Sequence, residues 1–367
     1  MSKIRILTIN PGSTSTKVAL FDDYDEIFSK NLEHPTDDLK KFNEIQDQLD
    51  YRAETVEGLV LENGYKMEDI DVFSGRGGGL LPLVGGTYAV TDLLVSHASK
   101  GMTGQHPAQL ASQICKRFAD KYGKKAYIVN PPDVDEFEDV ARVAGVKGIY
   151  RESHIHALNQ KEIAIRFCKE RGVKYEDVNL VICHLGGGIS VTAHGKGRMI
   201  DSNDIIKGSG PITPTRAGDL PYAKVLDLAY SGDYTKKELT DKFNKNGGFT
   251  DIFGTADVRE VKKLAEGGDK TAEVYYQGMI YQNAKYAGAM AVALKGKVDA
   301  IILTGGISND KTFTAKMAEY LDWIAEVVVM PGEFELEALA AGALRVERGE
   351  EEAKTYTGIP VWSGFGK

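Results

Sequence analysis

The sequence predicts an α/β fold made of two related domains, each built around a mixed β-sheet. The first observation is a repeat, because an apolar segment, a glycine-containing turn and a second apolar segment occur at residues 6–20 and again at residues 180–194. The second is the alternation of continuous apolar segments with helical patterns, which is typical of sheets covered by helices. The third is the length of 367 residues, which suits two domains. Together they predict duplicated domains that face each other across an interdomain cleft, where backbone N–H groups of the turns hold phosphate.

The elements of the first half follow from local patterns. Residues 4–9 and 16–21 are predicted to be paired strands around a turn. The polar stretch at residues 36–63 has a helical composition, and residues 72–79 run from an apolar strand into a glycine loop. Pro107 suits the first position of a helix, where its missing N–H costs nothing.

The second half continues the same alternation. A strand is predicted at residues 126–129, just before the second half. Ser153 is placed to cap a helix that ends at Gly172. After the second copy of the repeat, residues 271–294 predict a long helix and residues 298–306 predict a strand ending in two glycines. The remaining predicted elements are a helix from Lys311, a strand at residues 327–330 and a helix at residues 335–346.

The domain boundary is expected within ordered structure, because no Pro/Ser-rich linker is found. We expect residues 1–150 to form one domain and residues 151–349 to form the other. Residues 350–367 are a candidate for completing the first domain.

Composition narrows the possible functions. The formal net charge of −8 argues against an extended nucleic-acid-binding surface. No apolar run reaches the ~18 residues needed to span a bilayer, so we expect no membrane partner. Cys115, Cys168 and Cys183 are far apart and form no Cys-x-x-Cys motif, which is typical of buried thiols in a reducing, cytoplasmic location.

Three glycine-containing turns follow predicted strands, at residues 10–15, 184–188 and 304–308. Glycine lets the backbone approach a phosphate closely, and the N–H groups then act as donors. One such turn is equally well explained by chain reversal, but three at strand ends favour phosphate binding. Residues 12–17 and 305–312 come near the Walker A pattern with the wrong spacing. P-loop, dinucleotide-binding and protein-kinase motifs are therefore excluded.

Two arginines are candidates for binding an anion. Arg76 lies between Gly75 and Gly77, and Arg216 lies in a proline-rich loop that restricts its position. Each is equally well a surface charge when taken alone. Two of them in a protein with phosphate turns indicate an anion clamp.

Histidine and glutamate residues near these turns have two interpretations each. His184 directly precedes three glycines, so it is either a hydrogen-bonded core histidine or a donor to a transferring phosphoryl group. His106 precedes a proline and is a weaker candidate. Glu333 and Glu335 follow a Pro-Gly pair, where they either offset a helix dipole or help to hold Mg²⁺.

Taken together, four motifs resemble the acetokinase family, within the actin, sugar-kinase and Hsp70-like superfold. They are Asn10-Pro-Gly-Ser-Thr-Ser-Thr-Lys17, His184-Leu-Gly-Gly-Gly188, Gly210-Pro-Ile-Thr-Pro-Thr-Arg-Ala-Gly-Asp219 and Thr304-Gly-Gly-Ile307. Gly75-Arg-Gly-Gly-Gly-Leu-Leu-Pro82 and His156-Ala-Leu-Asn-Gln-Lys161 are similar to the butyrate kinase branch. The stretches His-Arg-Val-Val-His-Gly-Gly and His-Leu-Gly-Asn-Gly, typical of acetate kinases, do not occur.

The resemblance implies two duplicated domains of the actin-like ATPase (ribonuclease H-like) type, with the acid in the first lobe and the nucleotide in the second. It implies a kinase that converts ATP and butyrate, or a related short-chain fatty acid, into an acyl phosphate and ADP with Mg²⁺. Acetate, propionate or branched acids are the alternative substrates. A nucleotide-switched binding protein of the same superfold is an alternative from another class. Assembly as a homo-oligomer is also implied.

The resemblance also implies roles for individual residues. The expected catalytic residues are Arg76, His184, Arg216, His106 and Asp135. The expected nucleotide-binding residues are Asn10, Ser13, Ser15, Lys17, Gly186, Gly187, Gly188, Asp257, Arg259, Gly305, Gly306, Ile307 and Asn309. The expected metal-side residues are Asn10 and either Glu333 or Glu335. Asp135 is preferred over Asn130 and Asp133 for the family's active-site aspartate.

Overall fold

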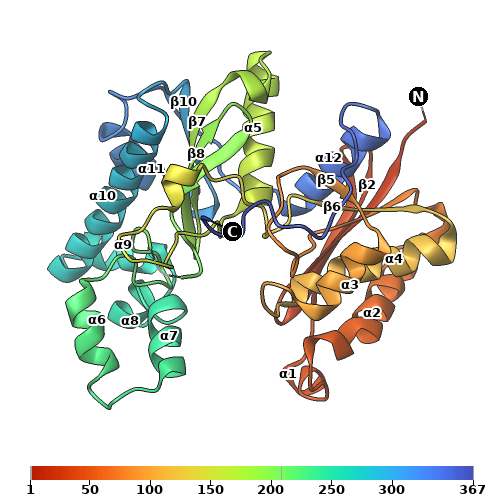
Figure 1. Cartoon of the computed structure of the whole chain (residues 1–367), viewed down its shortest axis with the longest axis horizontal. Coiled ribbons are helices and arrows are strands. Elements are labelled where there is room, and N and C mark those ends of the chain that lie inside the picture. Colours follow the sequence, from red (N-terminus) through yellow and green to blue (C-terminus); the bar gives the residue numbers. More distant parts are fainter. Residues whose placement is uncertain (1, 208, 367) are drawn as a thin grey trace. The chain divides into compact units, whose positions relative to one another are not determined.

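The computed structural model describes residues 2–207 and 209–366, which fold into two compact units (Figure 1). Unit 1 comprises the described residues up to Asp135, then Ala157–Glu162 and the described residues from Phe334 onward. Unit 2 comprises Glu136–His156 and the described part of Ile163–Glu333. The boundaries expected from the sequence put residues 136–150 in the first domain and residues 157–162 and 334–349 in the second. Compactness groups all three segments with the other unit. Residues 335–347, for example, form a helix that packs on the sheet of unit 1.

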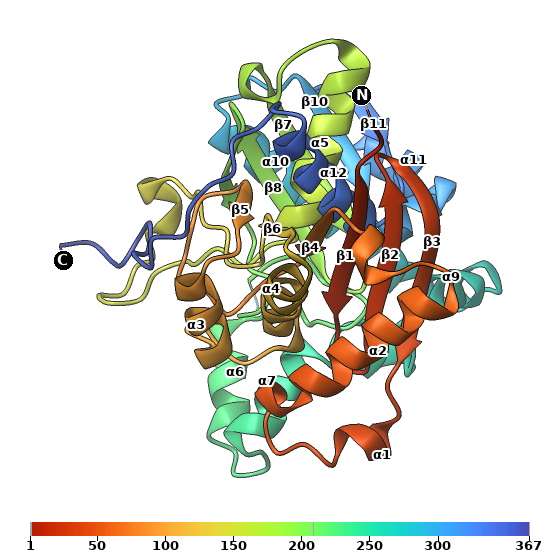
Figure 2. The same ribbon diagram turned by 90° about the vertical axis from the view of Figure 1, so that its right-hand side faces the viewer.

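Unit 1 contains a six-stranded sheet in the order β3-β2-β1-β4-β6-β5 (Figure 2). Its strands are β1 (Arg5–Pro11), β2 (Ser15–Asp22), β3 (Asp25–Glu33), β4 (Val72–Gly75), β5 (Thr87–Ala89) and β6 (Lys125–Val129). The hairpin strands β1, β2 and β3 are antiparallel, whereas β1, β4 and β6 run parallel. The carboxyl ends of the three parallel strands therefore lie at the same edge of the sheet.

Helices cover the two faces of this sheet. The helices of unit 1 are α1 (Thr36–Leu39), α2 (Leu49–Glu62), α3 (Asp92–Lys100), α4 (Leu110–Tyr122), the start of α5 (Ala157–Arg171) and α12 (Glu335–Glu347). Helices α2, α3 and α4 lie on one face (Figure 2). Helix α12 packs through Ala340, Ala343 and Leu344 against Ile6 and Val72 on the other face. A C-terminal helix thus completes the core of the N-terminal unit.

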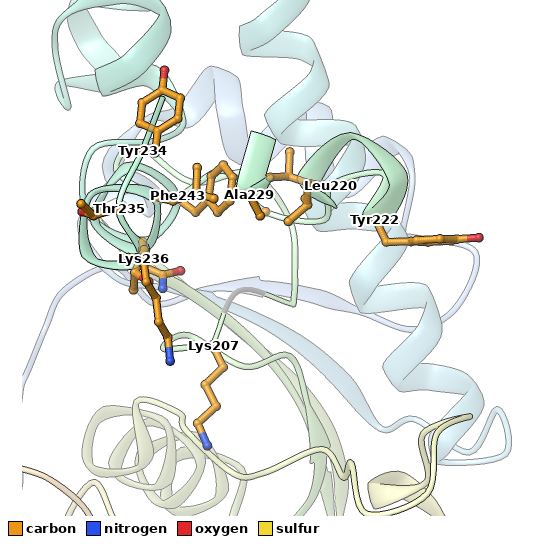
Figure 3. A pocket seen from close by; sticks show the side chains of 13 residues that line it. Lys207, Leu220, Tyr222, Ala229, Tyr234, Thr235, Lys236 and Phe243 are labelled. Carbon is orange, nitrogen blue, oxygen red and sulfur yellow. The ribbon is translucent and has the colours of Figure 1, made fainter. Parts of the chain in front are cut away.

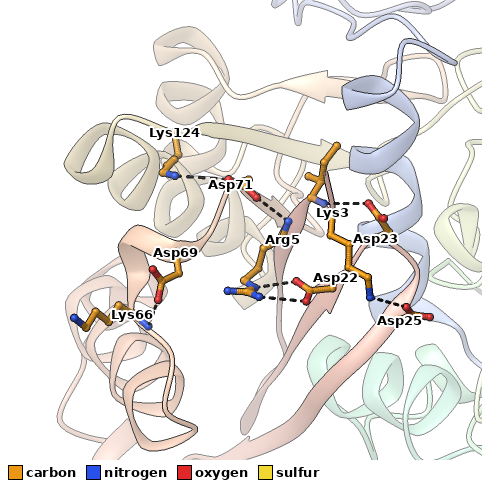
Figure 4. Close-up of polar contacts among 10 residues, drawn as sticks. Lys3, Arg5, Asp22, Asp23, Asp25, Lys66, Asp69, Asp71 and Lys124 are labelled. Atoms are coloured by element: carbon orange, nitrogen blue, oxygen red, sulfur yellow. Dashed lines mark hydrogen bonds and ion pairs between the residues drawn. The ribbon is translucent and has the colours of Figure 1, made fainter. Parts of the chain in front are cut away.

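The amino end of β1 is fixed by ion pairs and hydrogen bonds (Figure 4). Arg5 pairs with Asp22 at 2.9 Å, and its backbone N–H donates to Asp71. Lys3 pairs with Asp25 at 3.1 Å. These contacts help to set the register of the first hairpin. None of them involves the carboxyl end of β1.

Unit 2 contains a five-stranded sheet in the order β11-β10-β7-β8-β9. Its strands are β7 (Asn179–Leu185), β8 (Ile189–Gly195), β9 (Arg198–Ser202), β10 (Ala300–Thr304) and β11 (Val327–Val329). Its helices are the rest of α5, α6 (Tyr222–Ala229), α7 (Lys236–Asn244), α8 (Phe249–Phe253), α9 (Val258–Glu266), α10 (Lys270–Ala293) and α11 (Lys311–Glu319). The core forms where Met279, Ile280 and Ala287 of α10 pack with Val181 and Leu303 of the sheet.

The two sheets share one topology. In the order β3-β2-β1-β4-β6 and in the order β9-β8-β7-β10-β11, three antiparallel strands are followed by two strands parallel to the third. Asn10 at the end of β1 pairs with Lys17, and His184 at the end of β7 pairs with Ser190. The structure therefore confirms the predicted α/β fold class, with a duplicated domain and mixed sheets.

Some predicted elements differ in detail. The helix expected from Ser153 begins at Ala157, because Ser153 is buried and the chain turns at His156, with φ −81° and ψ 61°. Residues 36–63 contain α1, a 3₁₀ turn at Ile45–Gln48 and α2 in place of one helix. Pro107 begins a short 3₁₀ turn that leads into α4. Proline suits both kinds of turn at its first position, which is why sequence did not distinguish them.

The C-terminal tail adds to unit 1. Lys354 pairs through its backbone with Thr87 and Ala89 of β5, and the N–H of Val361 donates to the carbonyl of Pro82 at 2.9 Å. Within the described part of the chain, no helix combines the length and apolar character needed to cross a bilayer.

Candidate functional site

The carboxyl ends of β1 and β4 in unit 1 bring together charged side chains. Arg76 directly follows β4, and its backbone N–H donates to the carbonyl of Ile9, which holds the segment against β1. The Arg76 guanidinium forms an ion pair with Glu335, the first residue of α12. Asn10 Nδ2 donates to Glu335 Oε2 at 2.7 Å, and Lys17 Nζ lies 3.9 Å from the same oxygen. Four of the predicted site residues therefore form one cluster.

Glu335 is ionised in this cluster. Burial alone would raise the pKa of its carboxyl, but the charge and hydrogen bond of Arg76, with help from Lys17 and Asn10, hold the pKa below its ordinary value. The helix dipole of α12 acts in the same direction. Glu335 thus does more than offset the dipole, because it balances the two cations of the cluster.

The Asn10–Ser15 turn presents unpaired polar groups. The N–H of Gly12 donates to the carbonyl of Ser15 at 2.8 Å, which closes the turn. Ser13 is exposed, and the hydroxyl groups of Ser13 and Ser15 have no hydrogen-bond partner among the described residues. Such a turn offers donors to an anion.

His106 belongs to the surroundings of Arg76. Burial lowers the pKa of its imidazole, and the charges of Arg76 and Arg52 lower it further, so the ring is neutral at pH 7. Its Nδ1 accepts a hydrogen bond from the N–H of Ala108 at 3.1 Å. The ring therefore carries its proton on Nε2 and can donate from that atom.

The three candidates for the active-site aspartate have different surroundings. Asn130 Oδ1 accepts from the N–H of Gly86 at 2.7 Å, and Asp133 Oδ1 accepts from the N–H of Leu80 at 3.1 Å. Both side chains thus stabilise loops. Asp135 is buried, and its backbone N–H donates to the carbonyl of Leu83. Its catalytic role stays a prediction.

Unit 2 has an equivalent cluster at the end of β7. The imidazole of His184 is 5% exposed and stacks on that of His156, with ring centroids 4.1 Å apart and an interplanar angle of 20°. His156 Nδ1 and Ser190 Oγ are hydrogen-bonded at 2.8 Å. A Cβ atom at Gly186 would lie 3.3 Å from His184 Nε2 and 3.6 Å from Glu333 Oε1. The histidine and the glutamate therefore border the same glycine turn.

Arg216 lies directly over this turn. A Cβ atom at Gly188 would lie 1.9 Å from Arg216 Nη1, so any larger residue there would displace the guanidinium. The hydroxyls of Thr213 and Thr215 donate to the carbonyl of Gly187 at 2.8 and 2.9 Å, which fixes the proline-rich loop on the turn. Sequence reasoning missed the two threonines, because their partner lies 26 and 28 residues earlier in the chain.

The Arg216 guanidinium lacks partners. Its Nε and Nη1 atoms are buried and make no hydrogen bond. Burial lowers the pKa of this guanidinium, and Asp204 opposes that effect only partly. Buried donors without acceptors are costly, so the arrangement fits an anion that binds here. This is the most direct sign of a ligand site in unit 2.

The glycines after β10 pack against the same turn. Gly305 has a φ of 86°, and a Cβ atom there would lie 2.4 Å from the carbonyl oxygen of Leu185. Its backbone pairs with that of Gly332. Gly306 and Ile307 begin a 3₁₀ turn in which Asn309 Nδ2 donates to the carbonyl of Gly306. The structure therefore brings these predicted residues beside the His184 turn.

The side chains of Asp257 and Arg259 are partners of each other. Asp257 caps α9 by accepting from the N–H of Arg259, and the two side chains form an ion pair at 2.6 Å. This contact explains the pair structurally. Its role in nucleotide binding stays a prediction.

Two cavities in unit 2 were not anticipated. One, of about 450 Å³, is lined by Leu220, Phe243, Lys207 and Lys236 among others (Figure 3). A second, of about 420 Å³, is lined in part by Ala217, the residue after Arg216. Long-range packing of the segment around α6 and α7 forms both, so no local pattern in the sequence indicates them.

Comparisons with known proteins agree with this architecture. The model of the acetokinase family matches residues 145–325. The chain is 43% identical to butyrate kinase 2 of Clostridium acetobutylicum over 354 residues, which span 96% of this chain and 99% of that protein.

Two solved structures are similar over nearly the whole chain. Acetate kinase of Porphyromonas gingivalis has a TM-score of 0.75 at 18% identity, covering 94% of this chain and 99% of its own. A propionate kinase of Francisella tularensis has a TM-score of 0.72 at 19% identity, covering 93% and 99%. These likenesses show the fold, and the sequence identity to the clostridial protein shows the family. The chain belongs to the acetokinase family.

Proposed function

We propose that this chain transfers a phosphoryl group from ATP to the carboxylate of butyrate or a related short-chain fatty acid. Family membership and the 43% identity to a butyrate kinase support the reaction class. The observation that carries the proposal is the guanidinium of Arg216 over the Gly186–Gly188 turn, whose buried Nε and Nη1 atoms make no hydrogen bond. A phosphoryl group would supply the acceptors that Arg216 lacks.

Catalysis of this reaction depends on positioning the two substrates and stabilising negative charge more than on proton transfer. A carboxylate is already ionised at pH 7, so it attacks phosphorus without a strong base. The bond from the terminal phosphate to ADP breaks as the bond to the carboxylate oxygen forms, and charge spreads over the three equatorial oxygens. Arg216 and His184 are suited to donate hydrogen bonds to those oxygens.

Unit 1 has the features of a site for the acid. Arg76 matches the charge of a carboxylate, and His106, neutral and protonated on Nε2, adds a donor. In this role an incoming carboxylate competes with Glu335 for Arg76. Asp135 remains a candidate for orienting the acid.

The residues present also fit Mg²⁺. Among residues 2–207 and 209–366, no group of three or more His, Cys, Asp or Glu side chains could hold a metal ion. Mg²⁺ commonly uses only one or two protein oxygens together with waters and substrate phosphates, so it needs no larger cluster of protein ligands. Asn10 with Glu335 in unit 1, or Glu333 in unit 2, would hold it. The ion would neutralise charge on the β- and γ-phosphates.

A hydroxamate assay tests the proposal. Purified protein is incubated with ATP, Mg²⁺ and acetate, propionate, butyrate or isobutyrate, and acyl phosphate is trapped with hydroxylamine. We expect hydroxamate with butyrate at the highest kcat/KM. Discrimination by roughly 1 kcal/mol per methylene would make neighbouring acids slower but detectable. Absence of hydroxamate with every acid would overturn the proposal.

We also infer that the chain self-associates, as the resemblance implies. Size-exclusion chromatography with light scattering measures the mass directly. A mass close to the 40.1 kDa of one chain at micromolar concentration would contradict this inference.

A further inference from the structure

Arg52, in the first turn of α2, is the largest fully buried side chain of the described structure. Its exposed fraction is 0%, and its guanidinium faces the back of the Asn10–Ser15 turn. Nη1 donates to the carbonyl of Ser15 at 3.0 Å, and Nη2 donates to the carbonyl of Ser13 at 3.2 Å. Nε donates to Gln48 Oε1 at 3.0 Å.

This guanidinium has no carboxylate partner. All its hydrogen-bond acceptors are neutral, and none of the described acidic residues forms an ion pair with it. The nearby Asp50 is exposed and pairs with Arg117 instead. A cation in the first turn of a helix is also disfavoured by the helix dipole. Burying an uncompensated charge is costly, so a residue of this kind calls for an explanation other than stability.

The contacts of Arg52 determine which groups of the turn remain available. The carbonyls of Ser13 and Ser15 point to Arg52, and the carbonyl of Thr14 accepts from the N–H of His34 at 2.7 Å. The N–H groups of Ser13 and Thr14 have no partner among the described residues. With the carbonyls of Ser13, Thr14 and Ser15 held from behind, the turn presents the N–H groups of Ser13 and Thr14 to an incoming anion.

Thr16 and His34 extend this buried network. Thr16 Oγ1 accepts from Arg52 at 3.0 Å and is hydrogen-bonded to His34 Nε2 at 2.8 Å. The positive charge of Arg52 also lowers the pKa values of His34 and His106, although burial is the larger cause for both. Its charge therefore acts on the surroundings of both the turn and Arg76.

We infer that Arg52 is a positioning residue, whose buried charge holds the Asn10–Ser15 turn in its donor-presenting form and is balanced only when a phosphoryl group binds the turn. This rests on the proposed function, in which the phosphoryl group belongs to the nucleotide. Arg52 touches the turn and not the ligand. Its neutral surroundings keep the charge available for the incoming phosphate.

Gln48 offers a sharp test, because Gln48→Glu places a carboxylate on the acceptor of Arg52 Nε with almost no change of shape. The added internal counter-ion should leave the unliganded protein at least as stable and should weaken phosphate binding. A merely structural role of Arg52 would predict no loss of phosphate affinity. Gln46→Glu, two residues away on the same 3₁₀ turn, adds the same charge at a side chain that contacts Gln113 and not Arg52, and so serves as the control.

The readout is the melting temperature Tm as a function of inorganic phosphate concentration, which yields an apparent affinity. For Gln48→Glu we expect an unchanged or higher Tm without phosphate and an affinity at least fivefold lower than wild type. For Gln46→Glu we expect an affinity within twofold of wild type. Wild-type affinity in Gln48→Glu, or an equal loss in both variants, would overturn the inference.

Two substitutions of Arg52 complete the design. We expect Arg52→Gln to lower phosphate affinity at least tenfold and Arg52→Lys to lower it less. Arg142→Gln removes another buried arginine, 2% exposed, which donates to the carbonyl of Phe137 in unit 2. It should lower Tm but keep phosphate affinity; an equal loss there would make the effect general destabilisation and overturn the inference. If Arg52→Gln does not fold, the phosphate affinity of Gln48→Glu alone tests the inference.

Kinetics separates this inference from the proposed function. In a kinase assay, Gln48→Glu should raise the KM for ATP at least fivefold and leave the KM for the acid within twofold. If the wild type forms no acyl phosphate yet the phosphate affinities follow this pattern, the proposed function fails and the anion-binding role of Arg52 stands. If acyl phosphate forms and Gln48→Glu binds phosphate like wild type, only the inference fails.

Discussion

At the scale of single residues, two guanidinium groups without an ion pair stand out among the described residues. Arg216 directs buried, unpaired N–H groups over a glycine turn, whereas Arg52 uses its donors on the turn behind which it lies. The first is open to a ligand, and the second is hidden from it. A search of the sequence for arginines in glycine- and proline-rich loops finds Arg76 and Arg216 but not Arg52, since the turn that Arg52 contacts lies 36 to 39 residues earlier.

Replacement of Arg216 should reduce catalysis and spare the fold. We expect Arg216→Ala to lower kcat by about 10²- to 10³-fold, as the loss of one donor to a developing charge does elsewhere. Its Tm should stay within a few degrees of wild type, because buried donors without partners contribute little stability. Steady-state kinetics and thermal melting check both. Arg171→Ala, which removes an exposed partner of Glu326, is the control; a kcat unchanged in Arg216→Ala would remove it from the chemistry.

Gly188→Ala should act through Arg216. The added methyl group would meet Arg216 Nη1 at 1.9 Å and push the guanidinium away from the turn. We expect a fall in kcat of similar size to that of Arg216→Ala and no further fall in the double variant, since both changes remove the same interaction. Gly278→Ala in α10, where a Cβ atom meets nothing within 4 Å, should keep wild-type activity. Additive losses in the double variant would contradict this mechanism.

Stability should fall with acid through His34. Burial, followed by Arg52, lowers the pKa of this imidazole to about 4, whereas the unfolded chain titrates near 6.5. The contribution of the neutral ring is complete above pH 6.5. It is lost as pH falls towards 4, because the unfolded state then takes up a proton that the folded state does not. Urea unfolding at pH 7 and pH 5 should show a smaller decrease for His34→Gln than for wild type; equal decreases would exclude His34 as the cause.

At the scale of elements, α12 shows how packing and the site are connected. Its first residue, Glu335, contacts Arg76 and Asn10, and its middle packs against the sheet of unit 1. Sequence patterns predicted a helix at residues 335–346 almost at its observed bounds, Glu335–Glu347. They did not predict its partner sheet, because an amphipathic face does not specify which of two similar sheets it covers.

Gly342 is the closest point of that packing. A Cβ atom there would lie 2.5 Å from Val129 Cγ1, so Gly342→Ala should lower the free energy of unfolding by about 1–3 kcal/mol. Gly58→Ala in α2 meets nothing within 4 Å and should raise it by about 0.5–1 kcal/mol. Urea unfolding measures both. A neutral Gly342→Ala would show that α12 can shift on the sheet.

At the scale of the whole molecule, the repeat at residues 6–20 and 180–194 was enough to predict two α/β units, and the shared strand order confirms it. Nucleotide and acid roles of the site residues rest on family likeness and remain predictions. The duplicated topology also places Arg76 after β4 as Gly305 follows β10. Sequence gave no sign that the chain crosses between units at residues 136, 157, 163 and 334, since no linker composition marks those points.

The C-terminal tail should stabilise unit 1 selectively. Lys354 pairs with the backbone of β5, and the N–H of Ala89 donates to its carbonyl at 3.0 Å. Removal of all residues from Glu350 onward should therefore speed hydrogen exchange at the amide of Ala89 by at least tenfold, with exchange in α10 unchanged. Mass spectrometry of exchanged peptides measures both. Equal protection at Ala89 would show that the tail is dispensable for β5.

Because α12 is made near the end of synthesis, the ribosome releases the strands of unit 1 long before the helix that covers their second face. Even Tyr127, which is made after Ile6 and Val72, precedes Ala340, its partner in this core, by 213 residues (340 − 127). Unit 2 can complete its core while that apolar surface is still exposed in the nascent chain. Translation order thus makes the N-terminal unit the last to complete its core.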